Sequence, residues 1–324
     1  MRFSTLSALV AISIQALPVT HAQGPVVYPV KRAQSINAVH VPTYNEQWIY
    51  TVEIAIGNPP QKTLVQVDTG SPDLWVNANC SSAPTEFGLD DLCKKVPRYS
   101  PKTAQGPLGS RLLGYGSGDI GALVDIYEDT VEVGDAKVKS QKFGVASNSR
   151  GIPIGIMGLG PVLNASFAVN ESYHLLLDSM AAQKVIASRA YSLGLGSASD
   201  DQGSLIFGGL DKGRYSGALQ KLPIVKSRDG GTRDLGAELN EELGFYLVDC
   251  AVRDHKGGVT FGFGDGEITV PFREFIFTAQ GLCAVGLEGV KDGQQILGDS
   301  FLRAAYGKCL DNSEKCANLL VVFD

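Results

Sequence analysis

The chain has 324 residues, a formal net charge of −6 and 38 glycines. An acidic chain with no run of basic residues is a poor candidate for binding nucleic acid or an anionic membrane. The length favours two domains, each long enough to bury a core of its own. The four histidines are scattered without the spacing of metal ligands, so no metal site is predicted.

The first residues predict a secretory signal peptide over residues 1–22. A basic start is followed by a largely apolar stretch from Leu6 to Leu17, and small residues lead to a cleavage site after Ala22. This stretch is too short for a membrane span, which takes about 18 or more apolar residues, and no later segment of the sequence reaches that length. We therefore expect a secreted, extracellular protein.

The basic pair Lys31–Arg32 predicts a processing site just after the signal peptide. Cleavage there would leave residues 23–32 as a short propeptide and start the mature chain near Ala33. A surface pair of basic residues without that role is the plainer interpretation. Attachment to the cell surface would need a C-terminal anchor signal beyond Asp324.

Short apolar or alternating runs, separated by turn residues, predict strands throughout the chain. The clearest runs are Val52–Ile56, Thr63–Val67, Thr130–Val133 and Leu205–Phe207. A helical pattern is confined to places such as Ser172–Val185. The abundance of glycine also favours a fold with many turns, so the predicted class is all-β.

Six cysteines behind a secretory signal favour disulfide bonds over free thiols. Cys80 with Cys93, and Cys250 with Cys283, are predicted to close local loops. The remaining two, Cys309 and Cys316, lie close together near the C-terminal end and are left unassigned.

The stretch Val65–Ser71 places Asp68 on a tight Asp-Thr-Gly turn. Alternating apolar residues lead into the turn and the apolar Leu74–Val76 follows it, so Asp68 is predicted at the end of a buried strand. Thr69 offers a hydroxyl that can support the turn, and Gly70 lets the backbone approach closely. The plainer interpretation is a turn aspartate bonded to backbone N–H groups.

Several segments, in their order and spacing, resemble a fungal pepsin-like aspartic protease, nearest to the yapsin and secreted Candida-type branch. These segments are Gly57–Gln61, the Asp68 loop with Trp75, Tyr115–Gly118, Ser204–Asp211, Tyr215–Gly217 and Ile296–Arg303. The resemblance implies an all-β, bilobal fold, with an N-terminal lobe over residues 33–190 and a C-terminal lobe over residues 191–324. It also implies an endopeptidase that hydrolyses peptide bonds at acid pH without a cofactor.

By this resemblance, Asp68 is one of two catalytic carboxyl groups. Two neighbouring carboxyls that share one proton can activate a water on one side and polarise the peptide carbonyl on the other. Tyr115 would be the tyrosine of a β-hairpin flap that closes over the substrate, with Trp75 as its hydrogen-bond partner. Thr69 and Gly70 would shape the loop that meets the substrate. Core packing is the alternative for Tyr115 and Trp75, because buried rings of this kind usually need a polar partner.

The second half lacks the loop that should carry the partner of Asp68. In the family, strands and a second Asp-(Ser/Thr)-Gly turn separate the parts that match Leu222–Val225 and Leu235–Glu238. Here only Lys226–Asp234 joins them, which is too short for several strands at roughly 3.3 Å per residue. Asp229 begins an Asp-Gly-Gly turn, but its polar approach favours a surface turn over a second catalytic aspartate. We therefore expect an incomplete C-terminal lobe.

The C-terminal end departs from the family pattern as well. After Tyr306 the family continues directly into an apolar strand such as the one at Val321–Asp324, whereas Gly307–Leu320 intervenes here. Together with the deletion near Ser227, this insertion suggests a splicing or gene-model variant. Sequencing the transcript across both junctions would test that hypothesis.

The predicted function is therefore aspartic endopeptidase activity, impaired in this chain because the second loop is absent. The alternatives are a non-catalytic protein that binds peptides and a truncated product without a function of its own. We expect peptide or protein substrates and a monomer. The glycine-rich stretch 116–121 matches a dinucleotide-binding pattern, but a strand pattern rather than a helix follows it, so no cofactor is predicted.

Overall fold

The computed structural model describes most of the chain between residues 38 and 322. The described residues are 38–46, 49–85, 88–115, 120–160, 173–197, 199–211, 220–223, 238–240, 245–263, 266–279, 281–286, 297–310 and 318–322. The predicted signal peptide, the predicted propeptide, Asp229 and the junction near Ser227 lie outside them.

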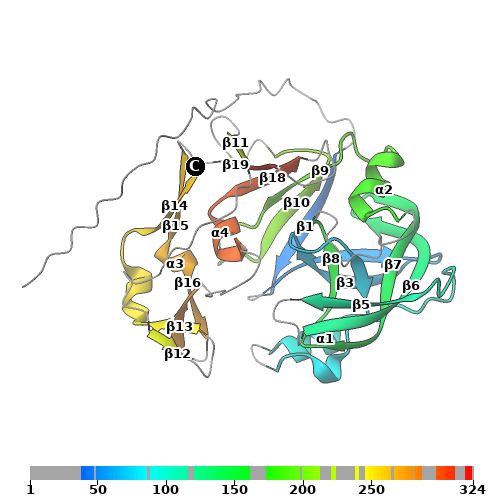
Figure 1. Cartoon of the computed structure of the whole chain (residues 1–324), viewed down its shortest axis with the longest axis horizontal. Helices are drawn as coiled ribbons and strands as arrows, with labels where there is room; N and C mark the ends of the chain where they lie inside the picture. The colour runs from blue at the N-terminus through cyan, green and yellow to red at the C-terminus, as the bar shows by residue number, and fades with distance from the viewer. Residues whose placement is uncertain are drawn as a thin grey trace, which may run out of the picture.

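Strands dominate the described residues, as the sequence predicts (Figure 1). The larger sheet contains β1 (Val39–Asn45), β2 (Tyr50–Ile56), β3 (Gln61–Asp68), β4 (Leu74–Val76), β5 (Ser110–Tyr115), β6 (Ile120–Val133), β7 (Ala136–Arg150), β8 (Gly155–Gly158), β9 (Ala190–Gly194), β10 (Gln202–Phe207), β11 (Gln220–Pro223), β18 (Tyr306–Leu310) and β19 (Asn318–Val322). Its order in the described part of the chain is β11-β19-β18-β9-β10-β1-β2-β3-β8-β4-β7-β6-β5, and β2 also pairs with β6.

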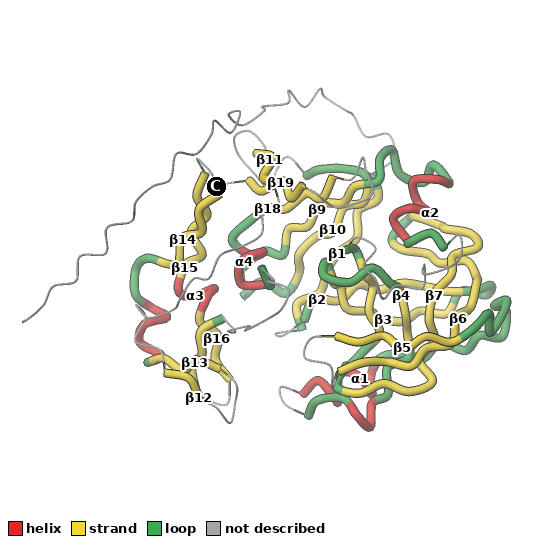
Figure 2. The backbone as a smooth tube through the Cα atoms, in the orientation of Figure 1, coloured by secondary structure: helices red, strands yellow, loops and turns green. Residues whose placement is uncertain are grey.

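A smaller β unit lies apart from most of this sheet (Figure 2). Its strands are β12 (Glu238–Asn240), β13 (Phe245–Val248), β14 (Gly258–Phe263), β15 (Gly266–Pro271), β16 (Ile276–Ala279) and β17 (Leu282–Val285). The order β12-β13-β17-β16 forms one sheet, and β14 pairs with β15 as a separate hairpin. The described helices are η1 (Cys80–Ser82), α1 (Leu89–Lys95), α2 (Leu176–Ala182), η5 (Cys250–Asp254), α3 (Phe272–Phe275) and α4 (Asp299–Arg303).

The predicted alternation is visible in β2. Val52, Ile54 and Ile56 are buried while Glu53 is exposed, because successive side chains of a strand point to opposite faces. Val52 pairs with Val65 of β3, so the two predicted strands lie side by side. The apolar side chains from β1, β2, β6 and β7 meet in one core, which stabilises the sheet by removing their surface from water.

A second core belongs to the smaller unit. Its buried members are Ile268, Val270, Phe275, Val285, Phe301 and Ala305. Each unit therefore buries its own apolar side chains, which gives the chain the two lobes and the all-β class that the sequence predicts.

The segment after α4 differs from the expectation drawn from the family pattern. Tyr306–Leu310 forms β18 at once and pairs with β9, so the first residues of the predicted insertion occupy the position next to β9. Asn318–Val322 forms β19, which pairs with β18 on one side and with β11 on the other. The apolar strand expected immediately after α4 therefore lies one strand further from β9.

The sheet continues across the boundary predicted at residue 190. β1 pairs with β10 from Val39 opposite Phe207 to Tyr44 opposite Gln202, and β10 pairs with β9. Hydrogen bonds thus connect the first described strand to strands beyond residue 190. The division of the chain at this residue stays a prediction.

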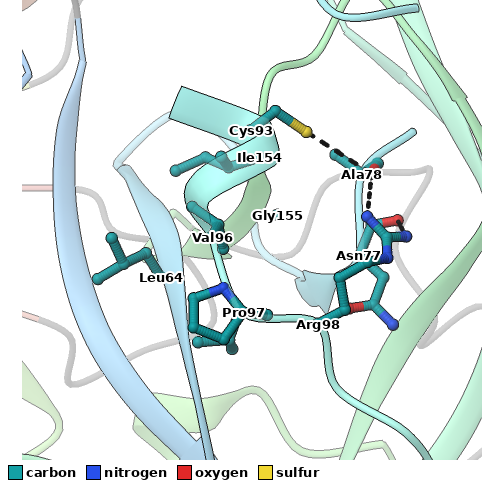
Figure 3. Close-up of a pocket in the computed structure, with 10 residues that line it drawn as sticks. Leu64, Asn77, Ala78, Cys93, Val96, Pro97, Arg98, Ile154 and Gly155 are labelled. Carbon is teal, nitrogen blue, oxygen red and sulfur yellow. Dashed lines mark hydrogen bonds between the residues drawn. The ribbon is translucent and has the colours of Figure 1, made fainter. Parts of the chain in front are cut away.

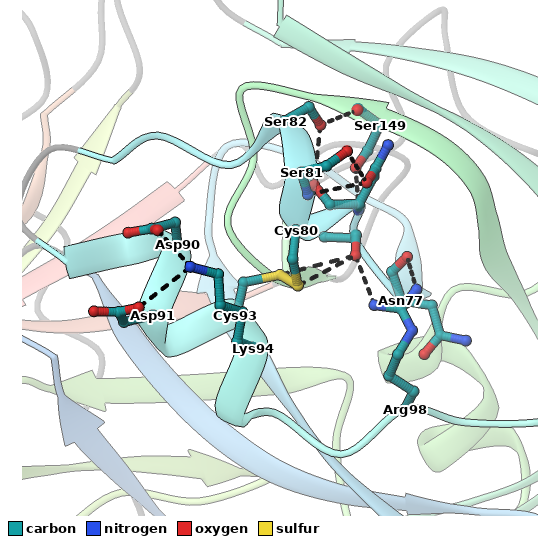
Figure 4. The surroundings of a disulfide bond; sticks show 12 residues. Asn77, Cys80, Ser81, Ser82, Asp90, Asp91, Cys93, Lys94, Arg98 and Ser149 are labelled. Carbon is teal, nitrogen blue, oxygen red and sulfur yellow. Dashed lines mark hydrogen bonds and ion pairs between the residues drawn. A yellow bond between two sulfur atoms is a disulfide. The ribbon is translucent and has the colours of Figure 1, made fainter.

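Two disulfides close local loops in the structure. Cys80–Cys93 joins η1 to α1, with an S–S distance of 2.01 Å (Figure 4). Cys250–Cys283 joins η5 to β17 in the smaller unit. Both are the pairs expected from the sequence, and Cys316 lies outside the described residues.

Candidate active site

Asp68 lies at the end of β3, where the strand passes into a tight turn with Thr69 and Gly70. Its Oδ1 accepts a hydrogen bond from the Gly70 N–H at 2.8 Å, and its Oδ2 accepts one from the Ser71 hydroxyl at 2.5 Å. Donors on both oxygens fix the orientation of the carboxyl group. Ser71 is a site residue that the sequence argument did not single out, although it closes the same motif.

The turn is held against β8, which runs parallel to β3. Asp68 pairs with Gly158, and the Gly158 N–H donates to the carbonyl of Asp73 at 3.0 Å. A Cβ on Gly158 would lie 2.4 Å from Asp73 N and from Pro72 C, a separation that side chains essentially never adopt. Glycine is therefore required at position 158 by the close approach of two backbones.

Trp75 and Tyr115 meet beside this turn. Trp75 is fully buried on β4, Tyr115 ends β5, and the Trp75 Nε1–H donates to Tyr115 Oη at 2.7 Å. Their ring centroids are 6.5 Å apart. Because Tyr115 Oη accepts this bond, its own proton remains available for another acceptor. The structure thus brings together two of the residues predicted for the flap.

The backbone that carries Trp75 is anchored where β4 ends. Asn77 has a positive φ of 67°, a conformation that asparagine tolerates better than most residues. The Arg98 guanidinium donates to the carbonyls of Ala78 and Asn77 at 2.9 and 3.0 Å (Figure 3). These contacts border a small pocket near Cys93, and they fix the end of β4 from the side of α1.

Burial and nearby carboxylates act on the tyrosines of this region. Burial raises the pKa of Tyr115 well above its ordinary value, the Trp75 hydrogen bond lowers it, and the charges of Asp68 and Asp73 raise it again. Burial and the charge of Asp68 likewise raise the pKa of Tyr191 on β9. Both hydroxyls therefore stay protonated at acid and neutral pH, where they can donate hydrogen bonds.

Asp299, the first residue of α4, is a partly buried carboxyl group whose pKa is affected by the charge of Asp68. Burial raises the pKa of Asp299, the Arg303 guanidinium lowers it, and the charge of Asp68 raises it. Asp299 belongs to Ile296–Arg303, one of the segments that carry the family resemblance, but the sequence did not predict a role for its side chain. In the sequence, Arg303 follows Asp299 by four residues, a spacing that places two opposite charges on the same face of a helix.

An apolar groove lies on the hairpin formed by β5 and β6, with β7 beside it. It has a volume of about 240 Å³, and Leu112, Ile120 and Leu123 line it together with Arg150. Leu112 is 76% exposed, which is unusual for a large apolar side chain. The groove begins three residues before Tyr115 in β5.

Two negative findings apply to the described residues. They contain no group of three or more His, Cys, Asp or Glu side chains placed to hold a metal ion. Among the helices in the same residues, none combines the length and the apolar character needed to cross a membrane.

The sequence matches the family model described as eukaryotic aspartyl protease over residues 49–232 and 231–318. The two matched ranges meet at residues 231–232, inside the short connection between Leu222–Val225 and Leu235–Glu238.

Curated proteins and a solved structure are similar over most of the chain. Secreted aspartic protease 5 of Candida albicans (strain SC5314 / ATCC MYA-2876) is 32% identical over 323 residues, covering 83% of this chain and 75% of that protein. Secreted aspartic protease 1 of Candida albicans is 34% identical over 325 residues, covering 83% and 80%. The probable aspartic-type endopeptidase opsB of Aspergillus oryzae (strain ATCC 42149 / RIB 40) is 28% identical over 365 residues, covering 93% and 74%. The crystal structure of an aspartic proteinase from Irpex lacteus has a TM-score of 0.68 at 18% identity, covering 88% of this chain and 97% of that one.

The lengths of these alignments carry further information. The alignments with the two Candida proteins span 323 and 325 positions, yet they include only 83% of the 324 residues of this chain. Each of these relatives therefore contains stretches without a counterpart in this chain.

Proposed function

The chain belongs to the eukaryotic aspartyl protease family, and from this we propose that Asp68 is its catalytic carboxyl group. The observation that carries this proposal is the environment of Asp68, at the end of a buried strand with the Gly70 N–H and the Ser71 hydroxyl on its two oxygens. A carboxyl group fixed in this way can accept a proton from a water that attacks a peptide carbonyl. The members of this family are aspartic endopeptidases, which are hydrolases.

Tyr115 and Trp75 are proposed to form the flap that closes over the substrate. Tyr115 lies at the end of β5, and its hydroxyl accepts a hydrogen bond from Trp75. The charge of Asp68 contributes to the raised pKa of this hydroxyl. The exposed apolar side chains of the same hairpin suit the apolar residues of a peptide, because burying them against a ligand removes them from water. A polypeptide in extended form therefore fits this surface.

Activity in this chain is proposed to be impaired. The connection Lys226–Asp234 leaves no room for a second Asp-(Ser/Thr)-Gly loop, and the two family-model ranges meet within it. Losing one member of an acid–base pair typically costs about 10²–10⁴-fold in rate. A peptide-binding protein without catalysis is the alternative function, and a truncated product without function is the other.

The remaining properties follow the family. The two Candida relatives are named secreted aspartic proteases, and the sequence begins with a predicted signal peptide over residues 1–22, so we place the protein outside the cell. A propeptide over residues 23–32, lobes divided near residue 190 and a monomeric mature chain complete the proposal.

The test uses the full chain, secreted from a fungal host and purified from the medium. Cleavage of a denatured protein is measured between pH 3 and 5 for the wild type, for Asp68→Asn and for Asp135→Asn. Asp135 is exposed in the turn between β6 and β7 and serves as the matched control. Weak cleavage that Asp68→Asn abolishes and Asp135→Asn retains supports the proposal, whereas cleavage that survives Asp68→Asn contradicts it.

Binding separates the alternatives. Calorimetry measures the affinity for a peptide in which a secondary alcohol replaces the cleaved amide. Binding without cleavage favours the non-catalytic peptide-binding protein, and the absence of both favours a truncated product.

A further inference from the structure

Exposed apolar side chains are concentrated on one hairpin of the larger sheet. Six large apolar side chains are exposed in the described part of the chain, and four of these lie on or just before β5 and β6: Leu108, Leu112, Ile120 and Leu123. Single exposed apolar residues are ordinary on a surface, whereas a contiguous group commonly marks a binding site. In Figure 1, β5, β6 and β7 stand apart from the strands of the smaller unit, so this group belongs to the larger sheet alone.

The strand register explains the shape of the groove on this hairpin. Leu112 of β5 lies opposite Leu123 of β6, and two residues further along β5, Gly114 lies opposite Gly121. Residues two apart on a strand point to the same face, so a pair of leucines stands beside a pair of glycines. The glycines, which have no side chains, form the floor of the groove of about 240 Å³. Pockets that enclose a small molecule hold about 300–1,000 Å³, so this groove suits the side chains of a ligand that lies across it.

The third strand adds a positive charge to the same face. Asn148 and Arg150 of β7 continue the two rows, opposite Leu123 and Gly121 respectively. Arg150 is exposed and lines the groove, and no carboxylate of the described residues lies within ion-pair distance of its guanidinium. The groove therefore combines an apolar wall with a cation that a ligand can pair.

The apolar wall lies on the other face of the hairpin from the core that contains Trp75. Leu113, Ala122 and Val124 alternate along the strands with the exposed leucines, and all three are buried in that core. The side chains of the apolar wall can therefore be changed without opening the core. A ligand in the groove likewise makes its contacts on the exposed face of these strands.

We propose that this groove binds an extended segment of a protein substrate, with an apolar side chain over the glycine floor and a carboxylate at Arg150. Leu123 and Arg150 are diagonal neighbours on adjacent strands, which are about 7–8 Å apart. In an extended peptide, residues two positions apart are separated by about 6.6 Å and point to the same side. The ligand therefore has an acidic residue two positions from an apolar one. The identity of this ligand as a substrate segment rests on the proposed function.

The surroundings of the groove favour a polypeptide over other ligands. β5 ends the order of the sheet and pairs with β6 alone among the described strands. Its outer edge offers backbone N–H and C=O groups, which a peptide can bond and an acyl chain cannot. The formal net charge of −6 makes an anionic membrane surface an unfavourable partner.

The experiment measures the affinity of the full secreted chain for a capped peptide with the sequence Glu-Ser-Leu-Ser-Glu. This peptide presents a glutamate two positions from the leucine in either chain direction. Calorimetry at pH 6 keeps the glutamates ionised, because their ordinary pKa is about 4.3. We expect replacement of the leucine by alanine to weaken binding about 10-fold, since the apolar contact is lost. No binding of the original peptide by the wild type overturns the proposal.

Two variants of the groove test the assignment in the same assay. Arg150→Gln should weaken binding about 5-fold, the upper range for an exposed ion pair. Lys139→Gln is the matched control, because it removes an exposed positive charge from β7 outside the groove. It should bind the peptide as the wild type does. Equal losses in Arg150→Gln and Lys139→Gln overturn the role of Arg150 and, with it, the proposal.

Gly114→Val should abolish binding by filling the groove. A Cβ at Gly114 would meet no atom within 4 Å, so the variant should fold, with a thermal unfolding curve close to that of the wild type. Gly262→Val in β14 is its control, because a Cβ there also meets no atom within 4 Å. Wild-type affinity in Gly114→Val overturns the proposal.

Two further measurements identify a different occupant of the groove. Sedimentation that shows association of the wild type, but not of Gly114→Val, would place a second copy of the chain there. Binding of decanoate that is tighter than that of the peptide and is lost in Arg150→Gln would place an acyl chain there. Either result overturns the peptide. Failure of the proposed function appears separately, as cleavage that survives Asp68→Asn.

Discussion

The indole N–H of Trp75 donates to the hydroxyl of Tyr115 at 2.7 Å, and this bond ties the buried strand β4 to the end of β5. It fixes the ring of Tyr115 beside the Asp68 turn, where Ser71 also interacts with the hydroxyl. The position of the Tyr115 ring at the end of β5 is thus tied to a donor in the core.

Replacing Trp75 with Phe removes this donor and leaves space in a fully buried site. We expect the free energy of unfolding to fall by about 2–3 kcal/mol, from lost packing and one lost hydrogen bond. Tyr115→Phe should cost about 1 kcal/mol. Urea unfolding of both single variants and the double variant gives the coupling between the rings, which should be about 1 kcal/mol. Strictly additive effects would show that the hydrogen bond contributes nothing to stability.

Gly158→Ala should disrupt the Asp68 turn, because the added Cβ would lie 2.4 Å from Asp73 N and Pro72 C. We expect a loss of about 1–3 kcal/mol or more in the free energy of unfolding, together with weaker peptide binding. Gly262→Ala in β14 is the control, since its Cβ would meet no atom within 4 Å. Unfolding curves that are the same for both variants would argue against tight packing of β8 on the turn.

The two disulfides should differ in their contribution to stability. Cys250 and Cys283 are separated by 33 residues, and Cys80 and Cys93 by 13. By lowering the entropy of the unfolded chain, the disulfide that closes the longer loop should stabilise the fold by about 3.7 kcal/mol, and the other by about 3 kcal/mol. Replacing each pair with serines should therefore lower Tm more for the pair in the smaller unit. A larger loss from the Cys80–Cys93 pair would mean that packing around η1 and α1 outweighs loop length.

Breaking the ion pair between Arg303 and Glu274 on one side should cost more than removing both partners. Arg303→Met removes the nearer cation of the buried Glu274 carboxylate and leaves the exposed Arg273 at 3.9 Å, which should cost about 3–5 kcal/mol or somewhat less. Adding Glu274→Gln removes the buried charge itself, so the double variant should regain part of that loss. Thermal unfolding at pH 6 measures both. A double variant less stable than Arg303→Met would show that Glu274 has other favourable contacts of greater weight.

The stability of the protein should fall as pH rises through the folded-state pKa of Asp299. Burial, with the charge of Asp68, raises this pKa above its unfolded value, so the protonated form is favoured by folding. The resulting stabilisation is complete below the unfolded pKa, near 3.9, and is lost as the group ionises in the folded chain. Asp299→Asn should flatten this decline at pH values above the unfolded pKa, relative to Asp135→Asn. Parallel pH curves for the two variants would show that the environment of Asp299 does not perturb its titration.

The sequence predicted those parts of the fold that depend on local patterns. Val52–Ile56 and Thr63–Val67 alternate, and they lie in β2 and β3; the helical stretch Ser172–Val185 contains α2. The strand β18 was not predicted, because Tyr306–Leu310 contains a glycine and a lysine within an apolar run. Its pairing with β9 joins two segments that are far apart in the sequence, so no local pattern indicates it.

The same division holds for the candidate site. The Asp-Thr-Gly turn alone predicts Asp68 as a site residue, and the family resemblance implies the hydrogen bond between Trp75 and Tyr115 that the structure contains. The effect of the Asp68 charge on the pKa of Asp299 has no such signature, because the two residues lie far apart in the sequence and only folding lets one act on the other.

The pairing of β1 with β10 has a consequence for how the protein can be made. β1 is synthesised early, but the edge of β1 that pairs with β10 stays unpaired until residues 202–207 have been synthesised. An expressed fragment that stops at residue 190 would leave that edge unpaired. Unpaired strand edges pair with those of other copies, so the fragment should tend to aggregate. A piece intended to stand alone as the N-terminal lobe therefore has to run through Phe207, where the partner of Val39 completes the pairing.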